Sequence, residues 1–277
     1  MKIIAGIVLY NADIPRLREN ISAIKPQVDK IVLIENGSRD TGYLKEFEGE
    51  KIELIVNDEN MGIAYALNQV MQFAHDNGAD WALTLDQDSV VAENLVKEYR
   101  KFMLPDVGIV TCCINDRNFV AYGEGRENDG EELQYCITSA SMTNVKAVME
   151  VGGFDNEMFI DWVDWDICLA LRNRGYKIRR AAKTHIIHEL GENTKSKIWH
   201  GHQLLIMRRS KMRNYYINRN WIYIARKWPE VSLFKNSLIC IKRIVIAILL
   251  EHNKWQSVKS LTKGMIDGFR MPIRGVQ

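Results

Sequence analysis

Four short apolar segments recur along the first 85 residues, and each of them ends in polar or glycine residues. They cover residues 3–10, 30–34, 52–56 and 82–85. Apolar side chains at helical spacing fill residues 63–75, and a proline marks another helix start near residue 15. Buried strands that alternate with polar turns and helices are typical of a parallel sheet with crossover helices. The sequence therefore predicts an α/β fold with a ligand crevice at the carboxyl edge of the sheet.

The fourth apolar segment leads directly into Asp86-Gln87-Asp88. Residues two apart in a strand point to the same side, so both carboxylates can reach one object. Mg²⁺ and Mn²⁺ prefer oxygen ligands and commonly take one or two carboxylates together with substrate phosphates. This pair is a candidate clamp for a metal-bound diphosphate. A solvated acidic turn after a strand is the alternative explanation.

A second acidic cluster places Asp161, Asp164 and Asp166 among Trp162 and Trp165. If a helix begins near Asp164, that carboxylate lies in the first turn and can face a crevice. Burial against aromatic rings raises the pKa of a carboxyl group and suits it to general base catalysis. Helix capping is the alternative, and it accounts for one acid but not for three. Any of the three acids is a candidate base.

The charge of the chain is divided unevenly along its length. Residues 201–277 hold 15 Lys and Arg against 3 Asp and Glu, whereas residues 1–200 hold 22 against 32. A basic tail on an acidic body indicates an anionic partner, and no nucleic-acid-binding motif accompanies this one. The five cysteines show no zinc or paired spacing, and the apolar start is too short for a signal peptide. We expect a cytoplasmic protein with free thiols.

The basic tail has the pattern of amphipathic helices. Residues 207–228 mix cations with aromatics, and the later apolar run of residues 238–250 is interrupted by Lys242 and Arg243, which makes it too short to span a bilayer. Such helices can lie on an anionic membrane surface. They can equally pack on the preceding part of the chain or form a homodimer. Four residues are candidates for the membrane interface: Trp221, Tyr223, Trp228 and Trp255.

Several motifs in a fixed order carry a resemblance to a known family. They are 33–40 (LIENGSRD), 60–68 (NMGIAYALN), 83–89 (LTLDQDS), 152–155 (GGFD), the 161–166 cluster and 188–191 (HELG). The chain resembles family-2 glycosyltransferases with the GT-A fold, and within them the bacterial rhamnosyltransferase-like members that build O-antigen and related surface polysaccharides. The resemblance implies a catalytic domain over residues 1–205, with a nucleotide-binding part to about 110 and an acceptor part from 111. Residues 206–277 form the helical basic appendage.

The resemblance also implies roles for individual residues. Asp164 matches the catalytic base, although Asp161 and Asp166 stay open because a second acid that often precedes the base is Val163 here. Asp86, Asp88 and His188 match the ligands of Mg²⁺ or Mn²⁺. An arginine frequent on the following helix is Ala170 in this chain. The donor nucleotide is expected near nine residues: Tyr10, Asn11, Glu35, Asn36, Asn60, Gly62, Asn68, Asp86 and Gln87.

The implied activity is metal-dependent, inverting transfer of a sugar from a nucleotide-sugar donor to a glycan acceptor. The donor would be dTDP-rhamnose and the acceptor a polyprenyl-diphosphate-linked glycan at the inner face of the cell membrane. A sugar-phosphate nucleotidyltransferase is a rival, but residues 6–11 lack its glycine-rich, basic phosphate loop. No Gly-x-Gly-x-x-Gly follows the first strand, which disfavours a dinucleotide oxidoreductase. A non-catalytic, membrane-associated binder of sugar nucleotides is the third hypothesis.

Overall fold

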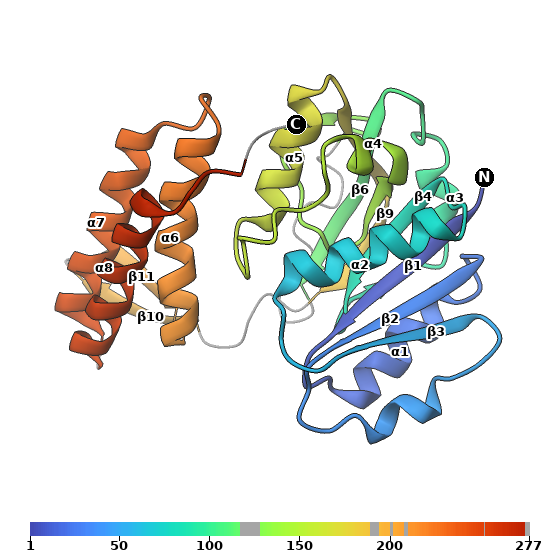
Figure 1. Ribbon diagram of the computed structural model, residues 1–277, viewed down its shortest axis with the longest axis horizontal. Coiled ribbons are helices and arrows are strands. Elements are labelled where there is room, and N and C mark those ends of the chain that lie inside the picture. Colours follow the sequence, from blue (N-terminus) through green and yellow to red (C-terminus); the bar gives the residue numbers. More distant parts are fainter. Residues whose placement is uncertain (117–127, 189–193, 200–201, 208–209, 252, 275–277) are drawn as a thin grey trace. The chain divides into compact units, whose positions relative to one another are not determined.

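The computed structural model describes residues 1–116, 128–188, 194–199, 202–207, 210–251 and 253–274. The chain divides into two compact units (Figure 1). The first comprises residues 1–159, 163–189 and 276–277, and the second comprises residues 160–162 and 190–275. A three-residue segment in the middle of the chain therefore groups with the C-terminal helices.

The first half of the main sheet is parallel, as the apolar segments predict. β1 (Ile3–Leu9), β2 (Lys30–Asn36), β3 (Ile52–Asn57) and β4 (Trp81–Asp86) pair in the order β3-β2-β1-β4. β1 and β2 are buried almost throughout, which explains why they read as continuous apolar runs. The carboxyl ends of all four strands lie at one edge, where the predicted site residues follow them.

The second half of the sheet is mixed. β8 (Ser141–Asn144) runs antiparallel to both β4 and β6 (Val107–Asp116), and β6 is parallel to β9 (Lys177–His188). Two short strands, β5 (Val90–Val91) and β7 (Glu132–Leu133), pair antiparallel with β9. Between β7 and β8, residues 134–140 form bends and a turn and not a strand.

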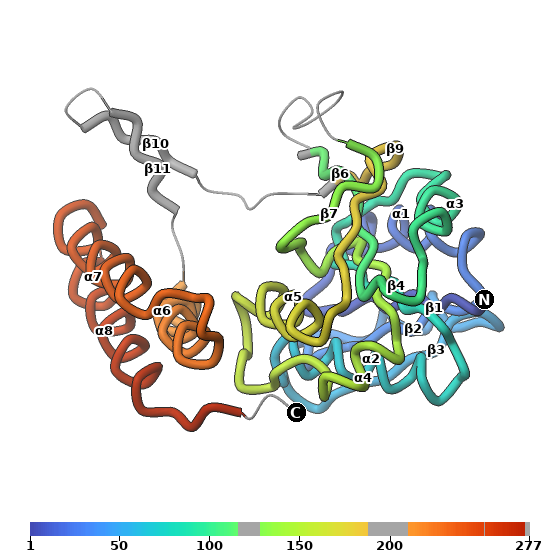
Figure 2. The backbone as a smooth tube through the Cα atoms, turned by 90° about the horizontal axis from the view of Figure 1, so that it is seen from above, coloured from blue at the N-terminus to red at the C-terminus, as the bar shows by residue number. Residues whose placement is uncertain are grey.

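Helices cover both faces of the parallel half. α1 (Ile14–Ile24) begins after Asp13, whose carboxylate accepts from the Arg16 amide at 3.1 Å, and it packs in one core with alternate residues of β1. α2 (Ile63–Asp76) packs on the opposite face, where an added Cβ at Gly6 would collide with Val70. Figure 2 shows these two helices on either side of the strands. The remaining helical elements of this unit are η1 (Gly42–Glu46), α3 (Leu95–Tyr99), α4 (Val145–Glu150) and α5 (Val163–Asn173).

Besides residues 160–162, the described part of the second unit contains three helices and a hairpin. α6 (Lys211–Lys227), α7 (Leu233–Leu250) and α8 (Lys254–Arg270) pack together, and β10 (Thr194–Trp199) pairs antiparallel with β11 (His202–Met207). Gly264 and Gly268 let α8 approach the backbone of α6, because a side chain at either position would strike carbonyl oxygens of that helix. Among the described residues, none of the helices has the length and hydropathy needed to cross a bilayer.

The structure corrects part of the expected membrane interface. Tyr223 and Trp228 are buried inside the helical unit, and the ring of Trp221 packs edge-on against Trp162 at a centroid distance of 4.1 Å. The prediction that Tyr223 and Trp228 are interfacial is therefore wrong, because the sequence pattern does not show which aromatics a helix bundle encloses. Trp255 is 88% exposed.

Candidate active site

Hydrogen bonds tie together the carboxyl ends of β1, β2 and β4. In the strand register, Leu9 of β1 lies opposite Glu35 of β2, and Val8 lies opposite Asp86 of β4. The Gln87 side chain accepts from the Tyr10 amide at 2.8 Å and donates to the Tyr10 carbonyl at 3.3 Å. The sheet edge thus brings the residues predicted to bind nucleotide to one place from well-separated parts of the sequence.

The turn after β2 is held against the turn after β1. The Asn11 amide donates to Ser38 Oγ at 2.7 Å, and Asn11 Oδ1 accepts from the Arg39 amide at 3.2 Å. Asn11 has a positive φ of 48°, a conformation that asparagine tolerates better than most residues. Ser38 and Arg39 both lie within the 33–40 motif, but the sequence gives no signal that they bond Asn11.

Glu35 is a buried carboxylate with two described hydrogen-bond donors. Its Oε1 accepts from the Ser38 amide at 2.7 Å, and its Oε2 accepts from the Tyr43 hydroxyl at 2.5 Å. Burial and then the hydrogen bond to Glu35 raise the pKa of Tyr43 well above its ordinary value, so the phenol stays protonated and continues to donate. Tyr43 escaped the sequence analysis, because a lone tyrosine eight residues away gives no signal of this contact.

Asn36 is the centre of a buried hydrogen-bond network that shapes the turn after β3. Its side chain bonds Asn60 Oδ1 at 3.3 Å and the Gly62 carbonyl at 3.3 Å, while its Oδ1 accepts from Asn57 Nδ2 and the Met61 amide, each at 3.1 Å. Gly62 has φ +86° and caps α2, and a Cβ there would lie 2.7 Å from the Phe159 carbonyl. Hydrogen bonds therefore bring Asn36, Asn60 and Gly62 together, and their contact with the donor nucleotide stays a prediction.

Asn68 lies on α2 and holds the turn of the 152–155 motif. Its Nδ2 donates to the Phe154 carbonyl at 2.8 Å and to Asn156 Oδ1 at 2.7 Å, and its Oδ1 accepts from the Phe154 amide at 2.8 Å. Gly153 packs so closely that an added Cβ would lie 2.6 Å from Asn68 Oδ1. In this structure the Asn68 amide binds protein groups, and the predicted contact with the donor stays a prediction.

Asp86 and Asp88 flank the turn that follows β4, and both are partly exposed. The Asp86 amide donates to Ser139 Oγ at 3.2 Å, and the Asp86 carbonyl accepts from buried Asn20 at 2.7 Å. Two partly exposed carboxylates at a strand end fit the coordination of Mg²⁺ or Mn²⁺, in which one or two carboxylates act with substrate phosphates. Among the described residues, no group of three or more His, Cys, Asp and Glu side chains could hold a metal ion. His188 ends β9, and its side chain lies outside the described part of the chain.

The acids of the second cluster occupy three different environments. Asp164 is in the first turn of α5, is partly exposed and accepts from the Trp165 amide at 2.9 Å. It lines a small cavity of about 10 Å³ together with Thr84, two residues before the end of β4. Asp166 is buried, and the Asp161 carboxylate pairs with Arg213 at 3.1 Å within the second unit. Asp164 is thus the acid of this cluster that lines a cavity with a β4 residue.

Cys136 and Cys168 line the same cavity as Asp164, and Trp165 follows Asp164 in α5. The rings of Tyr135 and Trp165 stack with centroids 4.0 Å apart, and Arg172 lies over Tyr135. The Cys168 Sγ lies 3.7 Å from the Cys136 Sγ, and this contact, burial and the Asp164 charge raise the pKa of the Cys168 thiol. Cys168 is therefore a neutral thiol at physiological pH and is not an activated nucleophile.

The fold and this edge define a class of protein. A parallel half-sheet carries Glu35, Asp86 and Asp88 at its carboxyl edge, and Asp164 at the start of α5 lies beside the same strand end. Polar side chains at the carboxyl ends of parallel strands occupy the place where open α/β sheets bind their ligands.

Comparison with known proteins shows the family to which the chain belongs. The sequence profile of glycosyl transferase family 2 matches residues 5–154, which is more than half of the chain, and the chain belongs to that family. It is 26% identical over 286 residues to the dTDP-rhamnosyl transferase RfbF of Shigella flexneri, covering 97% of this chain and 95% of the relative. The protein is therefore a glycosyltransferase, as the motifs predict.

Two solved structures share the fold. The mannosyltransferase PcManGT from Pyrobaculum calidifontis, in complex with GDP-Man and Mn²⁺, superposes with a TM-score of 0.60 at 11% identity and covers 97% of this chain and 87% of its own. S. aureus TarS 1–349, in complex with UDP, superposes with a TM-score of 0.57 at 12% identity, with 95% and 71% covered. These similarities confirm the expected GT-A-type fold.

Proposed function

We propose that this protein transfers L-rhamnose from dTDP-rhamnose to a lipid-linked glycan with inversion at the anomeric carbon. The observation that carries the donor assignment is similarity to a dTDP-rhamnosyl transferase along nearly the whole chain. The acidic pair at the end of β4 is separated from buried Glu35 of β2 by β1 alone, and this placement supports the nucleotide-diphosphate part of the proposal.

Asp164 is the proposed general base. It takes the proton from an acceptor hydroxyl while that oxygen forms a bond to the anomeric carbon, and the bond from that carbon to the diphosphate oxygen breaks with its electron pair. The partly exposed position of Asp164 at the N-terminus of α5 supports this role, because the carboxylate can reach a bound hydroxyl there. The sheet edge holds the donor, and binding both substrates aligns the reacting atoms.

A divalent metal ion is part of the proposal. Asp86 and Asp88 would hold Mg²⁺ or Mn²⁺, with His188 as a further candidate ligand. When bound, such an ion neutralises charge on the departing nucleoside diphosphate. Glu35 would accept a hydrogen bond from the nucleobase, in addition to its bonds from Ser38 and Tyr43.

The test is a transfer assay with dTDP-rhamnose, UDP-sugars and GDP-sugars in the presence of membranes that carry the lipid-linked acceptor. We expect metal-dependent release of dTDP from dTDP-rhamnose and loss of turnover in Asp164→Asn. Turnover only with a UDP- or GDP-sugar would replace the donor assignment. Formation of a nucleotide sugar from a sugar phosphate would favour the nucleotidyltransferase alternative.

We also propose that the helical unit holds the enzyme on the inner face of the cell membrane, where a lipid-linked acceptor would be found. α7 supports this proposal because its buried side chains are small or polar, whereas many of its large apolar side chains are exposed. Its face toward the other helices is small or polar and contains Asn236, Cys240 and Ala247. Large apolar residues at helical spacing are exposed along the other face: Phe234, Leu238, Ile241, Val245 and Ile248.

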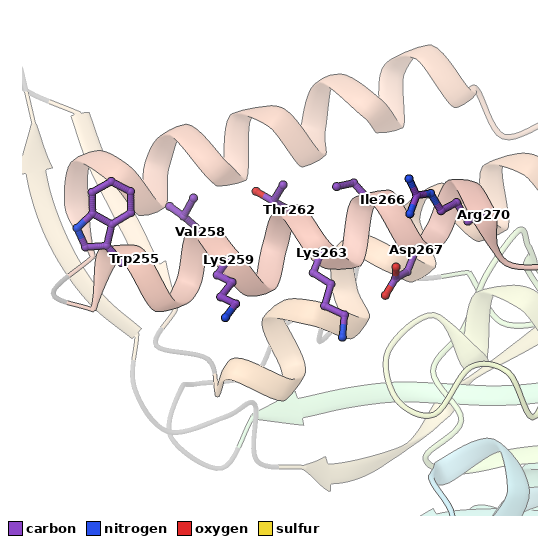
Figure 3. Close-up of a pocket in the computed structure, with 8 residues that line it drawn as sticks. All are labelled: Trp255, Val258, Lys259, Thr262, Lys263, Ile266, Asp267 and Arg270. Atoms are coloured by element: carbon purple, nitrogen blue, oxygen red, sulfur yellow. The ribbon is translucent and has the colours of Figure 1, made fainter.

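Positive charge favours an anionic bilayer over a second copy of this chain as the partner of α7. Trp255, Lys259, Lys263 and Arg270 line a surface groove of about 610 Å³ along α8 (Figure 3). The region from residue 201 onward holds 15 cations and 3 acids, so two such units would repel each other. Apolar residues with flanking cations and an exposed tryptophan match the headgroup boundary of an anionic membrane.

Vesicle flotation tests this surface. We expect binding to vesicles that contain phosphatidylglycerol and not to pure phosphatidylcholine vesicles, and loss of binding in the triple variant Leu238→Gln/Ile241→Gln/Val245→Gln. Leu104→Gln changes a similarly exposed leucine in the first unit and serves as the matched control. A wild-type dimer that this triple variant converts to a monomer would assign the surface to a homodimer instead.

A further inference from the structure

Residues 160–162 join Phe159 to α5, the helix that carries Asp164. Phe159 and α5 belong to the first unit, but these three residues group with the second unit. Asp161 and Trp162 have φ values of 64° and 72°, and neither is glycine. The left-handed region is disfavoured for such side chains, so the surrounding contacts must hold the segment in this conformation. α5 begins at the next residue, Val163.

Asn220 of α6 provides the backbone contacts. Its Nδ2 donates to the carbonyl oxygens of Ile160 and Asp161, each at 2.9 Å. The Asn220 side chain is fully buried, and its Oδ1 accepts from Arg219 Nε at 2.9 Å, which fixes the orientation of the amide. One side chain therefore binds two successive carbonyl groups next to the left-handed residues.

Two further contacts from α6 hold the side chains of the segment. Arg213 donates from Nη2 to Asp161 Oδ1 at 3.1 Å and from Nε to both carboxylate oxygens at 3.2 and 3.3 Å. The ring of Trp162 packs edge-on against Trp221 at 4.1 Å, with an interplanar angle of 64°. Three residues of one helix thus contact three consecutive residues of the segment.

We infer that Asn220 and Arg213 are positioning residues for the glycosyl transfer. They hold residues 160–162 in the left-handed conformation from which α5 starts, and so they set where Asp164 lies three residues after Asp161. The inference rests on the proposed role of Asp164 as the base. It also assigns Asp161, previously a candidate base, to positioning, because Arg213 binds its carboxylate in a bidentate pair.

The test compares Asn220→Ala with Asn218→Ala. Asn218 is also a buried asparagine of α6, but it bonds the Cys240 and Leu261 carbonyls and not the segment. We expect kcat to fall roughly 10- to 100-fold in Asn220→Ala, because small displacements of a catalytic group cost that much. The KM for the nucleotide sugar and the nucleotide-binding stoichiometry should stay unchanged. For Asn218→Ala we expect the wild-type kcat, when kcat is calculated from the concentration of protein that binds nucleotide.

A glycine rescue separates positioning from simple destabilisation. Glycine adopts positive φ without a steric cost, so Asp161→Gly/Asn220→Ala should regain several-fold in kcat over Asp161→Ala/Asn220→Ala. Both double variants lack the carboxylate, and they differ in backbone freedom. Equal kcat values in the two double variants, or an unchanged kcat in Asn220→Ala, would overturn the inference.

Two controls keep the outcome decisive. If Asn220→Ala does not fold, Arg213→Gln gives the same comparison, because Arg213 is half exposed and its loss leaves no buried cavity. Asp161→Asn should retain far more kcat than Asp164→Asn, and the reverse order would make Asp161 the base. Absence of transfer by the wild-type enzyme with every nucleotide sugar would refute the proposed function instead, independently of these variants.

Discussion

The hydrogen bond between Tyr43 and Glu35 supports a quantitative prediction for Tyr43→Phe. The substitution keeps the ring and removes a 2.5 Å hydrogen bond to a carboxylate that is 1% exposed. Hydrogen bonds to charged groups contribute about 1.5–3 kcal/mol, so we expect the free energy of unfolding to fall by about 2 kcal/mol at pH 8. The Ser38 amide remains as a donor to Glu35, which keeps the loss within that range.

The pH dependence of this difference follows from the direction of the pKa shift. Burial and the bond to Glu35 raise the pKa of Tyr43 in the folded protein above its unfolded value of about 10. The contribution of Tyr43 is therefore fully present below pH 10 and is lost as the pH rises further, because the unfolded state releases the proton more readily. The difference in the free energy of unfolding between wild type and Tyr43→Phe should therefore decrease above pH 10.

Guanidinium unfolding followed by circular dichroism at pH 8 and pH 11 measures both effects. Tyr176→Phe is the matched control, because the Tyr176 hydroxyl also donates to a carboxylate, Glu150 at 2.6 Å, but on the exposed surface. Surface substitutions of this kind usually change stability by less than about 0.5 kcal/mol. The prediction fails if Tyr43→Phe lowers the free energy of unfolding as little as Tyr176→Phe does. It also fails if the loss caused by Tyr43→Phe is the same at both pH values.

Three further predictions test other parts of the structure. Asp164→Asn should lose turnover but keep the stabilisation by nucleotide seen in thermal melts, whereas loss of both would remove Asp164 from its proposed role. Gly37→Ala should unfold at markedly lower denaturant than wild type, because Gly37 has φ +79° and a Cβ would strike the backbone of Glu59 and Asn60; an unchanged midpoint would contradict that packing. Burial raises the pKa of Cys240 to about 12, so mass spectrometry should find this thiol unlabelled by iodoacetamide in the folded protein at pH 8 and labelled after unfolding.

The sequence predicts the parallel half of the sheet well for a physical reason. Strands such as β1 and β2 are buried on both faces and so appear as continuous apolar runs with polar ends. The same reasoning could not show that β8 runs antiparallel between β4 and β6, because an apolar run carries no strand direction. Periodicity likewise left the buried positions of Tyr223 and Trp228 undetermined, since cations and aromatics alternate along α6.

The candidate site, like the sheet, could be predicted from the sequence only in part. Glu35, Asn60 and Asp86 lie at one edge of the sheet because parallel strands place their carboxyl ends together, and this could be predicted from the sequence. The partners that hold those residues lie elsewhere in sequence: Tyr43 for Glu35, and Ser139 for Asp86. The link from Asn220 to residue 160 spans 60 positions, and a single sequence gives no signal for such a contact.

We propose that the edge formed by β1, β2 and β4 binds a nucleoside diphosphate with a divalent metal. Thermal melting of wild type and Asp88→Ala, with dTDP, UDP, GDP and their sugars, with and without Mn²⁺, measures this binding. Ligand at roughly 100 times its Kd should stabilise the folded protein by about 2.7 kcal/mol. We predict a metal-dependent shift, largest with dTDP compounds and absent in Asp88→Ala. A folded wild-type protein that no nucleotide stabilises would contradict the account.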